Sequence, residues 1–147
     1  MPNDYFMRVG DGNHYRSSTK FATWGITSRH SHAKMFMRNV VPGDRLWFLQ
    51  RGGKIIGVAT FVSANLRELG PLIQITPTNE EYGWVETKGS WDTEVHYTDL
   101  YDLEKCNITT TKKQSQSGIL RFNLEKCGIN LPEEYLFIVK YSNAFRR

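Results

Sequence analysis

The chain has 147 residues, enough for one domain with a hydrophobic core of its own. Its formal net charge of +4 suits a polyanionic partner without requiring one. The N-terminus lacks the features of a secretory signal, and no apolar run reaches membrane-spanning length. We therefore expect an intracellular protein, cytoplasmic or nuclear, with no membrane partner.

The first part of the chain alternates short apolar stretches with polar turns. Residues 5–9 predict a strand, 10–13 a glycine-rich turn, and 14–20 one helical turn. Residues 21–26 predict a second strand, with Trp24 near its end.

A helix is expected next. Ser28 or Ser31 can cap it, and it runs to about Val40. The apolar residues of this segment recur at helical spacing, which predicts one face turned towards the core.

A β-hairpin is the clearest predicted element. Residues 45–50 and 54–62 are its strands, and Gly52-Gly53 is read as a two-residue loop. The segment 64–72 is expected to be a connector that can be helical.

The second half contains more scattered elements. Residues 94–103 alternate in polarity and predict a strand, whereas 109–117 predict an exposed polar loop. Residues 119–127 predict a short helix, because apolar side chains recur there at helical spacing, and 134–141 predict a last strand. Shorter elements are expected at 74–76 and 79–81. No repeat or linker divides the chain, so we expect a single β-rich α+β domain over residues 1–147 with two or three helices.

Three tryptophans, Trp24, Trp84 and Trp91, are flanked by Gly, Ser, Thr and Asp, which are typical of strand ends and loops. Flat aromatic faces at loop rims can stack nucleobases or surround a methylated group. The alternative is that each plugs one end of a β-barrel. Trp47 lies within the hairpin and can belong to the core or to the site.

Polar groups near these tryptophans could complete a nucleotide site. Asp11 and Asn13, in the glycine-rich turn, can read a base edge. Cations that could contact phosphates are Arg16, Lys20, Arg29, Lys34, Arg38, Lys112, Lys113, Arg146 and Arg147. For most of them, an ordinary solvated surface role is the simpler interpretation.

Several chemistries lack their motifs. The sequence has no Walker loop, dinucleotide fingerprint, Gly-x-Ser-x-Gly or Cys-x-x-Cys, so no cofactor is expected. His30-x-His32 has no further ligand at suitable spacing, and we predict no metal site. Four acidic residues follow one another around the strand at 94–103, and alternating solvated carboxylates are the favoured interpretation. They are Asp92, Glu94, Asp99 and Asp102.

The order of several short motifs resembles the EVE domain of the PUA-like superfamily. They are Trp24-Gly-Ile-Thr-Ser, Ala33-Lys-Met-Phe-Met-Arg, Pro42-Gly-Asp-Arg-Leu-Trp-Phe and Lys54-Ile-Ile-Gly-Val-Ala. The related YTH domain has a similar order. The resemblance covers residues 5–103. Three further stretches resemble EVE-like proteins of large DNA viruses: Asn65-Leu-Arg-Glu-Leu-Gly-Pro-Leu, Thr78-Asn-Glu-Glu-Tyr-Gly-Trp and Trp91-Asp-Thr-Glu-Val-His-Tyr. Lys34-Met35 stands where the EVE pattern has Arg-Asn, and the spacing of Trp84 and Trp91 departs from the YTH pattern.

The resemblance implies a mixed β-pseudobarrel with flanking helices that reads a modified base in RNA or DNA. By that resemblance Trp24, Trp84 and Trp91 are the walls of an aromatic cage. Asp11 or Asn13 reads the base edge, and Asn39 is a further candidate for this role. Phosphate contacts are assigned to Arg29, Lys34, Arg38, Lys112 and Lys113.

Three hypotheses follow. The first is a non-enzymatic reader of a modified base, N-methylated or otherwise substituted, without catalytic residues. The second is a nucleoside-modifying enzyme similar to ASCH domains, which would recruit Lys54, Glu94 and Asp92. The third is a protein-interaction module that anchors a partner through exposed tryptophans.

Overall fold

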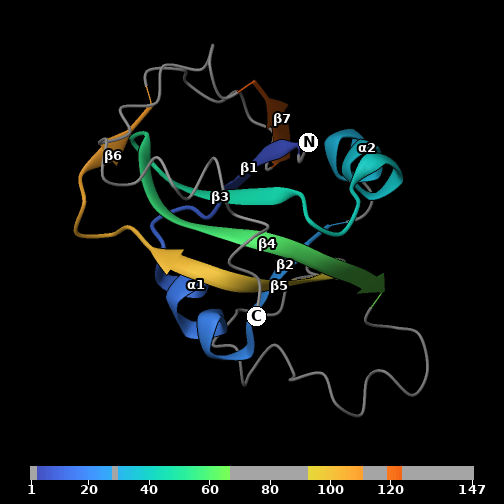
Figure 1. The fold of residues 1–147 in the computed structure, drawn as a ribbon, viewed down its shortest axis with the longest axis horizontal. Coiled ribbons are helices and arrows are strands. Elements are labelled where there is room, and N and C mark those ends of the chain that lie inside the picture. The colour runs from blue at the N-terminus through green and yellow to red at the C-terminus, as the bar shows by residue number, and fades with distance from the viewer. Residues whose placement is uncertain (1–2, 28–29, 67–92, 111–118, 124–147) are drawn as a thin grey trace.

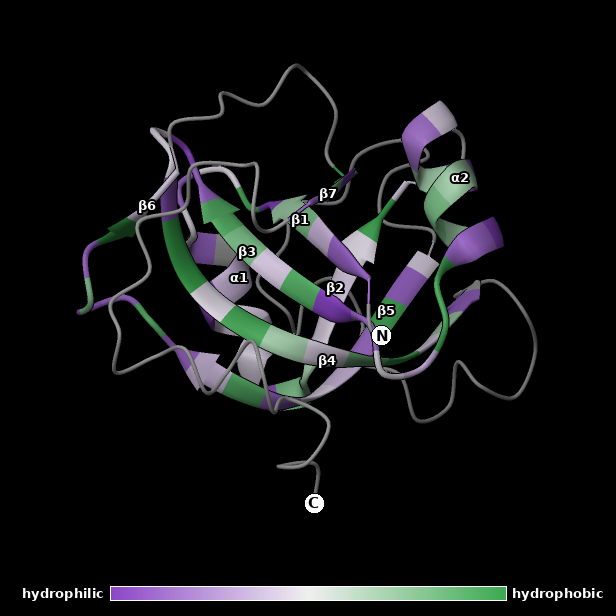
Figure 2. Ribbon diagram, turned by 45° about the horizontal axis from the view of Figure 1, so that its top comes forward, coloured by the Kyte–Doolittle hydropathy of each residue, from purple (hydrophilic) through white to green (hydrophobic). Residues whose placement is uncertain are grey.

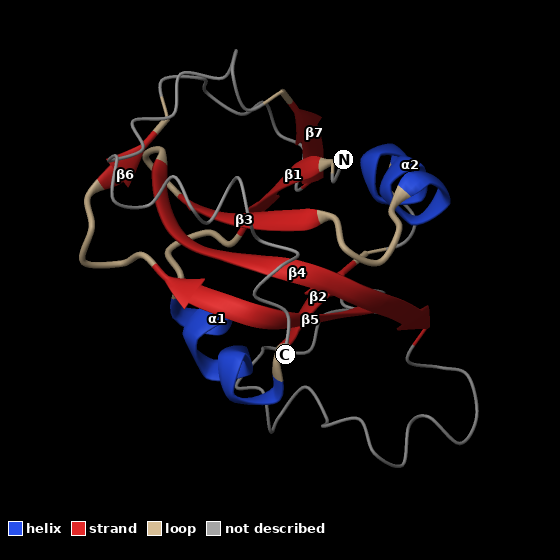
Figure 3. Ribbon diagram, in the orientation of Figure 1, coloured by secondary structure: helices blue, strands red, loops and turns tan. Residues whose placement is uncertain are grey.

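The computed structural model describes residues 3–27, 30–66, 93–110 and 119–123, and the structural statements below concern these ranges. The elements in chain order are β1 (Asp4–Arg8), α1 (Asn13–Ser18), a 3-10 helix η1 (Thr19–Phe21), β2 (Thr23–Ile26), α2 (Ser31–Asn39), β3 (Arg45–Gln50), β4 (Lys54–Leu66), β5 (Thr93–Asp102), β6 (Ile108–Thr109) and β7 (Ile119–Phe122). Figure 3 shows how the strands dominate the described part of the chain.

The strands of the described ranges form one curled, open sheet (Figure 1). The strand order is β2-β5-β4-β3-β1-β7, and β6 pairs with β4 beside this path. β1 runs parallel to β3, whereas the other described pairs are antiparallel. Such a mixed sheet with two short α-helices confirms the predicted α+β, β-rich architecture.

A buried ion pair joins the parallel strands β1 and β3. Arg45 donates from Nε and Nη2 to the two carboxylate oxygens of Asp4, with 2.9 Å between Nη2 and Oδ2. The indole Nε1 of Trp47 donates to Asp4 Oδ1 at 2.8 Å. Asp4 and Arg45 are both 6% exposed, so the carboxylate depends on these donors rather than on water. Trp47 thus belongs to the core.

Two apolar clusters cover the two faces of the sheet, because successive side chains of a strand point to opposite sides. The face that includes Tyr5, Trp24, Phe48 and Tyr97 is called the inner face below, and Phe36 of α2 packs on it, edge-on to Tyr5 with ring centroids 5.0 Å apart. The other face carries Phe6, Trp47, Leu49, Ile55, Val58, Leu103 and Ile108. Burial on both faces explains why β3 and β4 read as near-continuous apolar runs.

The predicted hairpin is confirmed, but its predicted loop is one residue too short. Gln50 pairs with Lys54, which leaves three residues in the loop, and the N–H of Gly53 donates to the Gln50 carbonyl at 3.0 Å. Gly52 and Gly53 have φ angles of 97° and 96°, a region that disfavours other residues. β4 also continues to Leu66, so the first part of the predicted connector at 64–72 is strand.

The start of α2 and of β2 also differs from the prediction. Ser31 is the first helical residue of α2, and the extended residue before it, His30, makes no side-chain cap. Phe21 belongs to η1 rather than to the second strand. The predicted strands at 5–9 and 94–103 and the helical turn at 14–20 are confirmed within about one residue.

The predicted helix at 119–127 is wrong in its first part. Residues 119–122 are β7, which pairs antiparallel with β1. Phe122 stacks on Phe6 with ring centroids 3.9 Å apart, while Ile119 packs on the inner face. Pairing with an available strand edge overrides the weak helical spacing of such a short segment.

Other predictions fall partly or wholly outside the described residues. The predicted loop at 109–117 begins inside β6, and its remainder from residue 111 lies outside. The elements at 74–76, 79–81 and 134–141 lie wholly outside, and the extent of a single domain over 1–147 stays a prediction.

Gly57 of β4 allows α1 to dock on the sheet. A Cβ at this position would lie 2.2 Å from the hydroxyl oxygen of Tyr15, and 3.3 Å from both the Tyr15 Cζ and the Leu100 Cδ1. Tyr15 is buried and its ring lies 4.7 Å from that of Phe48. Because Gly57 has no side chain, the Tyr15 phenol fits against β4 and packs α1 on the sheet.

We predict that Asp4→Asn lowers the free energy of unfolding by about 3–5 kcal/mol, because Arg45 keeps its buried charge without a counter-charge. Urea unfolding measures this change. Glu104→Gln is the control, since it removes the exposed ion pair with Arg16 and is expected to cost less than about 1 kcal/mol. Equal losses in the two variants would contradict the role given to Asp4.

We predict that Gly57→Ala destabilises the protein by about 1–3 kcal/mol through overpacking against Tyr15. Tyr15→Phe removes the oxygen that the new methyl would meet, so the double variant should recover part of the loss. A double-mutant cycle in urea gives the coupling energy. Additive losses would show that the two positions do not constrain each other.

Candidate nucleic-acid interface

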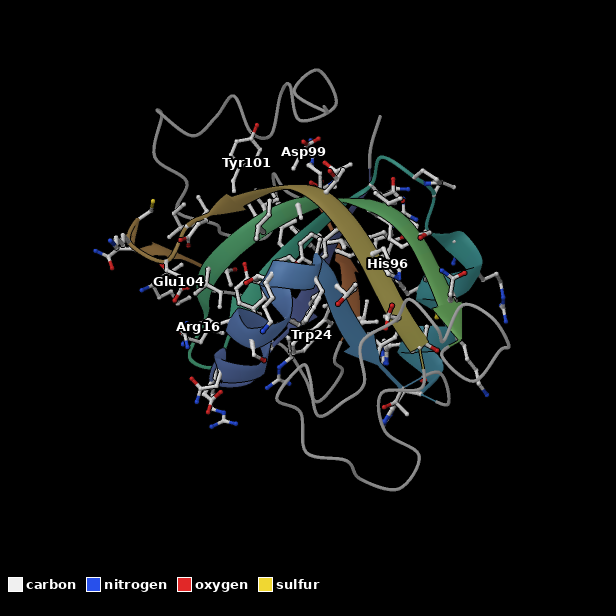
Figure 4. The ribbon with its side chains drawn as sticks, turned by 90° about the horizontal axis from the view of Figure 1, so that it is seen from below. Arg16, Trp24, His96, Asp99, Tyr101 and Glu104 are labelled. Carbon is white, nitrogen blue, oxygen red and sulfur yellow. The ribbon has the colours of Figure 1, made fainter. Side chains whose placement is uncertain are left out.

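Trp24 lies on β2, opposite Val95 of β5. It is 6% exposed and belongs to the apolar cluster of the inner face. Figure 4 shows it on the side of the sheet where α1 lies. The sequence favoured an accessible rim position, whereas this burial is what the barrel-plug alternative expects. A base can reach the indole only if the groups that cover it move.

Tyr97 is a neighbour of Trp24 that the sequence analysis missed. The register places it diagonally across from Trp24 on the same face, a spacing at which large side chains interact. Its ring centroid lies 5.2 Å from that of Phe48. Burial raises the pKa of the Tyr97 hydroxyl, so it stays neutral at physiological pH. The alternation of Val95 and Tyr97 was the signal that could have found it.

Asp11 and Asn13 are brought together, but they bind each other. The backbone N–H of Asn13 donates to Asp11 Oδ1 at 2.9 Å, and its side-chain amide donates to Asp11 Oδ2 at 3.1 Å. Gln50 Nε2 donates to the Asp11 carbonyl at 2.6 Å. Both residues are exposed. A base edge would therefore have to exchange with these bonds.

The same network continues to Arg16 of α1. Arg16 Nη1 donates to Asn13 Oδ1 at 3.2 Å, and Nη2 lies 2.7 Å from Glu104 Oε1. The hydrogen bond to Glu104 is the largest cause that raises the pKa of Arg16. Figure 4 shows Arg16 and Glu104 close to each other. This cation is therefore held towards a carboxylate, although its side chain is 42% exposed.

Asn39 lies apart from the other two predicted edge readers. Its amide donates to the Met35 carbonyl at 2.9 Å, at the end of α2. Figures 1 and 2 both show α1 and α2 at different ends of the sheet. One base therefore cannot contact Asn39 together with Asp11 or Asn13.

The outer surface of α2 is basic. Lys34 and Arg38 are exposed and four residues apart, so they lie on the same side of the helix. α2 contains no acidic residue, and Figure 2 shows hydrophilic residues at both of its ends. The other predicted phosphate contacts and two of the cage tryptophans lie outside the described residues: Arg29, Lys112, Lys113, Trp84 and Trp91.

The residues named for an ASCH-like activity do not converge. Glu94 pairs with Asn65, which lies eleven residues after Lys54 along β4. At the rise of an extended strand this places Lys54 and Glu94 roughly 30 Å apart. Asp92 lies outside the described residues. Lys54 and Glu94 therefore do not lie in one site.

Glu94 is also not the solvated carboxylate that the sequence suggested. It is 1% exposed, and its Oε1 lies 2.8 Å from Nε2 of His96. Asp99 is half-buried and Asp102 is exposed, so only the latter fits the expectation of a solvated side chain. The two-residue alternation ends at Asp99, whose φ of 52° accompanies an irregularity in the pairing of β4 with β5.

In the part of the chain that the structure describes, no group of three or more His, Cys, Asp or Glu side chains could hold a metal ion. His30 and His32 are exposed. No described helix is long and apolar enough to cross a membrane.

Comparison with solved structures identifies the fold. The Mmi1 YTH domain superposes with a TM-score of 0.50 at 10% identity, over 98% of this chain and 99% of that one. Mmi1 in complex with RNA gives 0.44 at 11% identity, over 69% of this chain and 57% of that one. The Zygosaccharomyces rouxii MRB1 YTH domain, in complex with N6-methyladenosine RNA, superposes with a TM-score of 0.41 at 14% identity, over 69% of this chain and 60% of that one.

The chain has the fold of a YTH domain, a mixed, curled half-barrel sheet with two short helices. This confirms the fold implied by the resemblance. No family model matches the sequence, and no curated protein is similar to it. The comparisons give no support for a similarity to proteins of large DNA viruses.

Proposed function

We propose that this domain binds nucleic acid without catalysis and reads a modified, methylated base through an aromatic cage built around Trp24. One observation carries the proposal: Trp24 and Tyr97 lie diagonally across β2 and β5 on one face, in a chain with the fold of a YTH domain. The sequence resemblance to EVE and YTH domains assigns Trp24 to the cage independently of this geometry.

The cage needs walls from both strands. Trp24 supplies one from β2 and Tyr97 a second from β5. Trp91 precedes Thr93, the first residue of β5, by two positions in the sequence, and is proposed as a third. Each stacked face would contribute about 1–3 kcal/mol. A methyl group adds apolar burial worth about 0.8 kcal/mol.

Cationic and polar side chains would hold the nucleic-acid strand on either side of the base. β2 begins next to η1, and its last residue, Ile26, lies five positions before α2, so a nucleic-acid strand that follows β2 meets both helices. Lys34 and Arg38 would contact phosphates at the α2 end. Asp11, just before α1, or Asn13, the first residue of α1, would read a base edge after exchanging their mutual hydrogen bonds.

RNA with N6-methyladenosine is the first ligand to test, since the MRB1 YTH domain is in complex with it. DNA with the same base and RNA with a modified cytosine complete the panel. A protein-interaction module would show no salt-dependent binding to any of these oligonucleotides.

We predict that Trp24→Ala weakens binding of the methylated oligonucleotide by about 5- to 150-fold, the loss of one stacked face. Because Trp24 is buried, Trp24→Phe is made in parallel, since it retains a ring and preserves the fold better. Isothermal titration gives the affinity and circular dichroism the fold. Phe122→Ala is the control, as it removes a ring that packs against the other cluster. Wild-type affinity in folded Trp24→Ala would contradict the cage.

We predict that the double variant Lys34→Ala, Arg38→Ala binds methylated and unmethylated strands more weakly by the same factor. Its plot of log affinity against log salt should lose about 0.7 in slope per lost phosphate contact. Lys105→Ala removes an exposed lysine from the turn after β5 and is the control. An unchanged slope in the double variant would exclude α2 from the interface.

A further inference from the structure

The hydroxyl oxygen of Tyr97 is buried and has no hydrogen-bond partner among the described residues. The whole side chain is 4% exposed, so water does not compensate. A buried hydroxyl without a partner costs about 1–3 kcal/mol. Phenylalanine would fill the same place without that cost, so the oxygen calls for an explanation other than stability.

The ring of Tyr97 has aromatic neighbours, and the phenol of Tyr15 lies near enough for Tyr97 to contribute to the raised pKa of Tyr15. Phe48 lies beside the ring, Phe61 of β4 is its paired residue, and Trp24 is its diagonal neighbour. The backbone N–H of Tyr97 donates to the Ala22 carbonyl at 3.1 Å, which ties its strand to the start of β2. The Tyr97 side chain is therefore held on β5, diagonal to the Trp24 indole that the proposed function assigns to the cage.

We propose that the Tyr97 hydroxyl donates a hydrogen bond to a ring nitrogen or carbonyl oxygen of the bound base, and so selects its orientation. This inference rests on the proposed function and adds a polar contact to the stacking contacts. A base seated against Trp24 would bring an acceptor to a side chain that water does not reach, and the hydroxyl would gain the hydrogen bond it lacks in the free domain. Stacking alone tolerates any base, whereas a fixed donor does not.

Tyr5 offers a matched comparison. Its hydroxyl is also buried without a described partner, and its ring also lies on the inner face. It sits on β1, which β4 and β3 separate from β5, and it packs against Phe36 of α2. Tyr5 thus shares the desolvated oxygen of Tyr97 but not its place beside Trp24.

The test compares Tyr97→Phe, Tyr5→Phe and the wild-type chain by thermal unfolding and by titration with the modified oligonucleotide that the wild type binds best. Both variants lose one unpaired oxygen, so both should unfold at or above the wild-type temperature. Tyr97→Phe should weaken binding about tenfold, the value of one hydrogen bond, whereas Tyr5→Phe should bind as wild type.

Two outcomes overturn this inference alone. The first is that the wild type binds and Tyr97→Phe binds within twofold of it. The second is that Tyr97→Phe lowers the unfolding temperature whereas Tyr5→Phe does not, because the Tyr97 oxygen would then have a structural partner. A wild-type chain that binds no modified oligonucleotide overturns the inference together with the proposed function.

Discussion

The buried carboxylate of Asp4 organises the parallel centre of this fold. Parallel strands cannot be joined by a tight turn, so β1 and β3 are connected by residues 9–44, which include both helices and β2. Arg45 and the Trp47 indole, both on β3, converge on Asp4 at the first position of β1. An isolated charge at that depth is costly, so the network favours the register in which all three groups meet.

That register determines what each face of the sheet can carry. It sends Tyr5 and Phe48 to the inner face and Phe6 and Trp47 to the other. β4 and β5 continue the alternation across the sheet and place Tyr97 beside Phe48, with Trp24 beyond it on β2. The proposed base site on β2 and β5 thus depends on the pairing of β1 with β3 elsewhere in the sheet.

Local sequence predicted the elements whose signal is local. The hairpin was predictable because two glycines at positive φ lie between apolar strands, and β5 because polarity alternates along it. β7 was not, because four residues that complete a sheet edge carry no signal of their partner β1. The distance between Lys54 and Glu94 was also missed, because the sequence does not reveal that Glu94 of β5 pairs with the far end of β4.

The site was predicted in part for a related reason. The turn-forming residues beside Trp24 predicted that it lies at a strand end. They do not indicate that Tyr15 and Phe48 share its apolar cluster, so its burial was missed. Tyr97 has no turn residues beside it and was overlooked, although the sheet brings it to Trp24. The sequence placed Asp11 and Asn13 in one turn, and the structure shows them in contact, because that contact is local.

Tryptophan-fluorescence titration of the wild-type chain with one RNA, with and without N6-methyladenosine at a single position, tests the central claim most directly. The account predicts saturable quenching at a lower concentration of the methylated strand, because the base must displace the cover of Trp24 and stack on it. Equal curves for the two strands, or no quenching by either, would contradict a reader of this modified base.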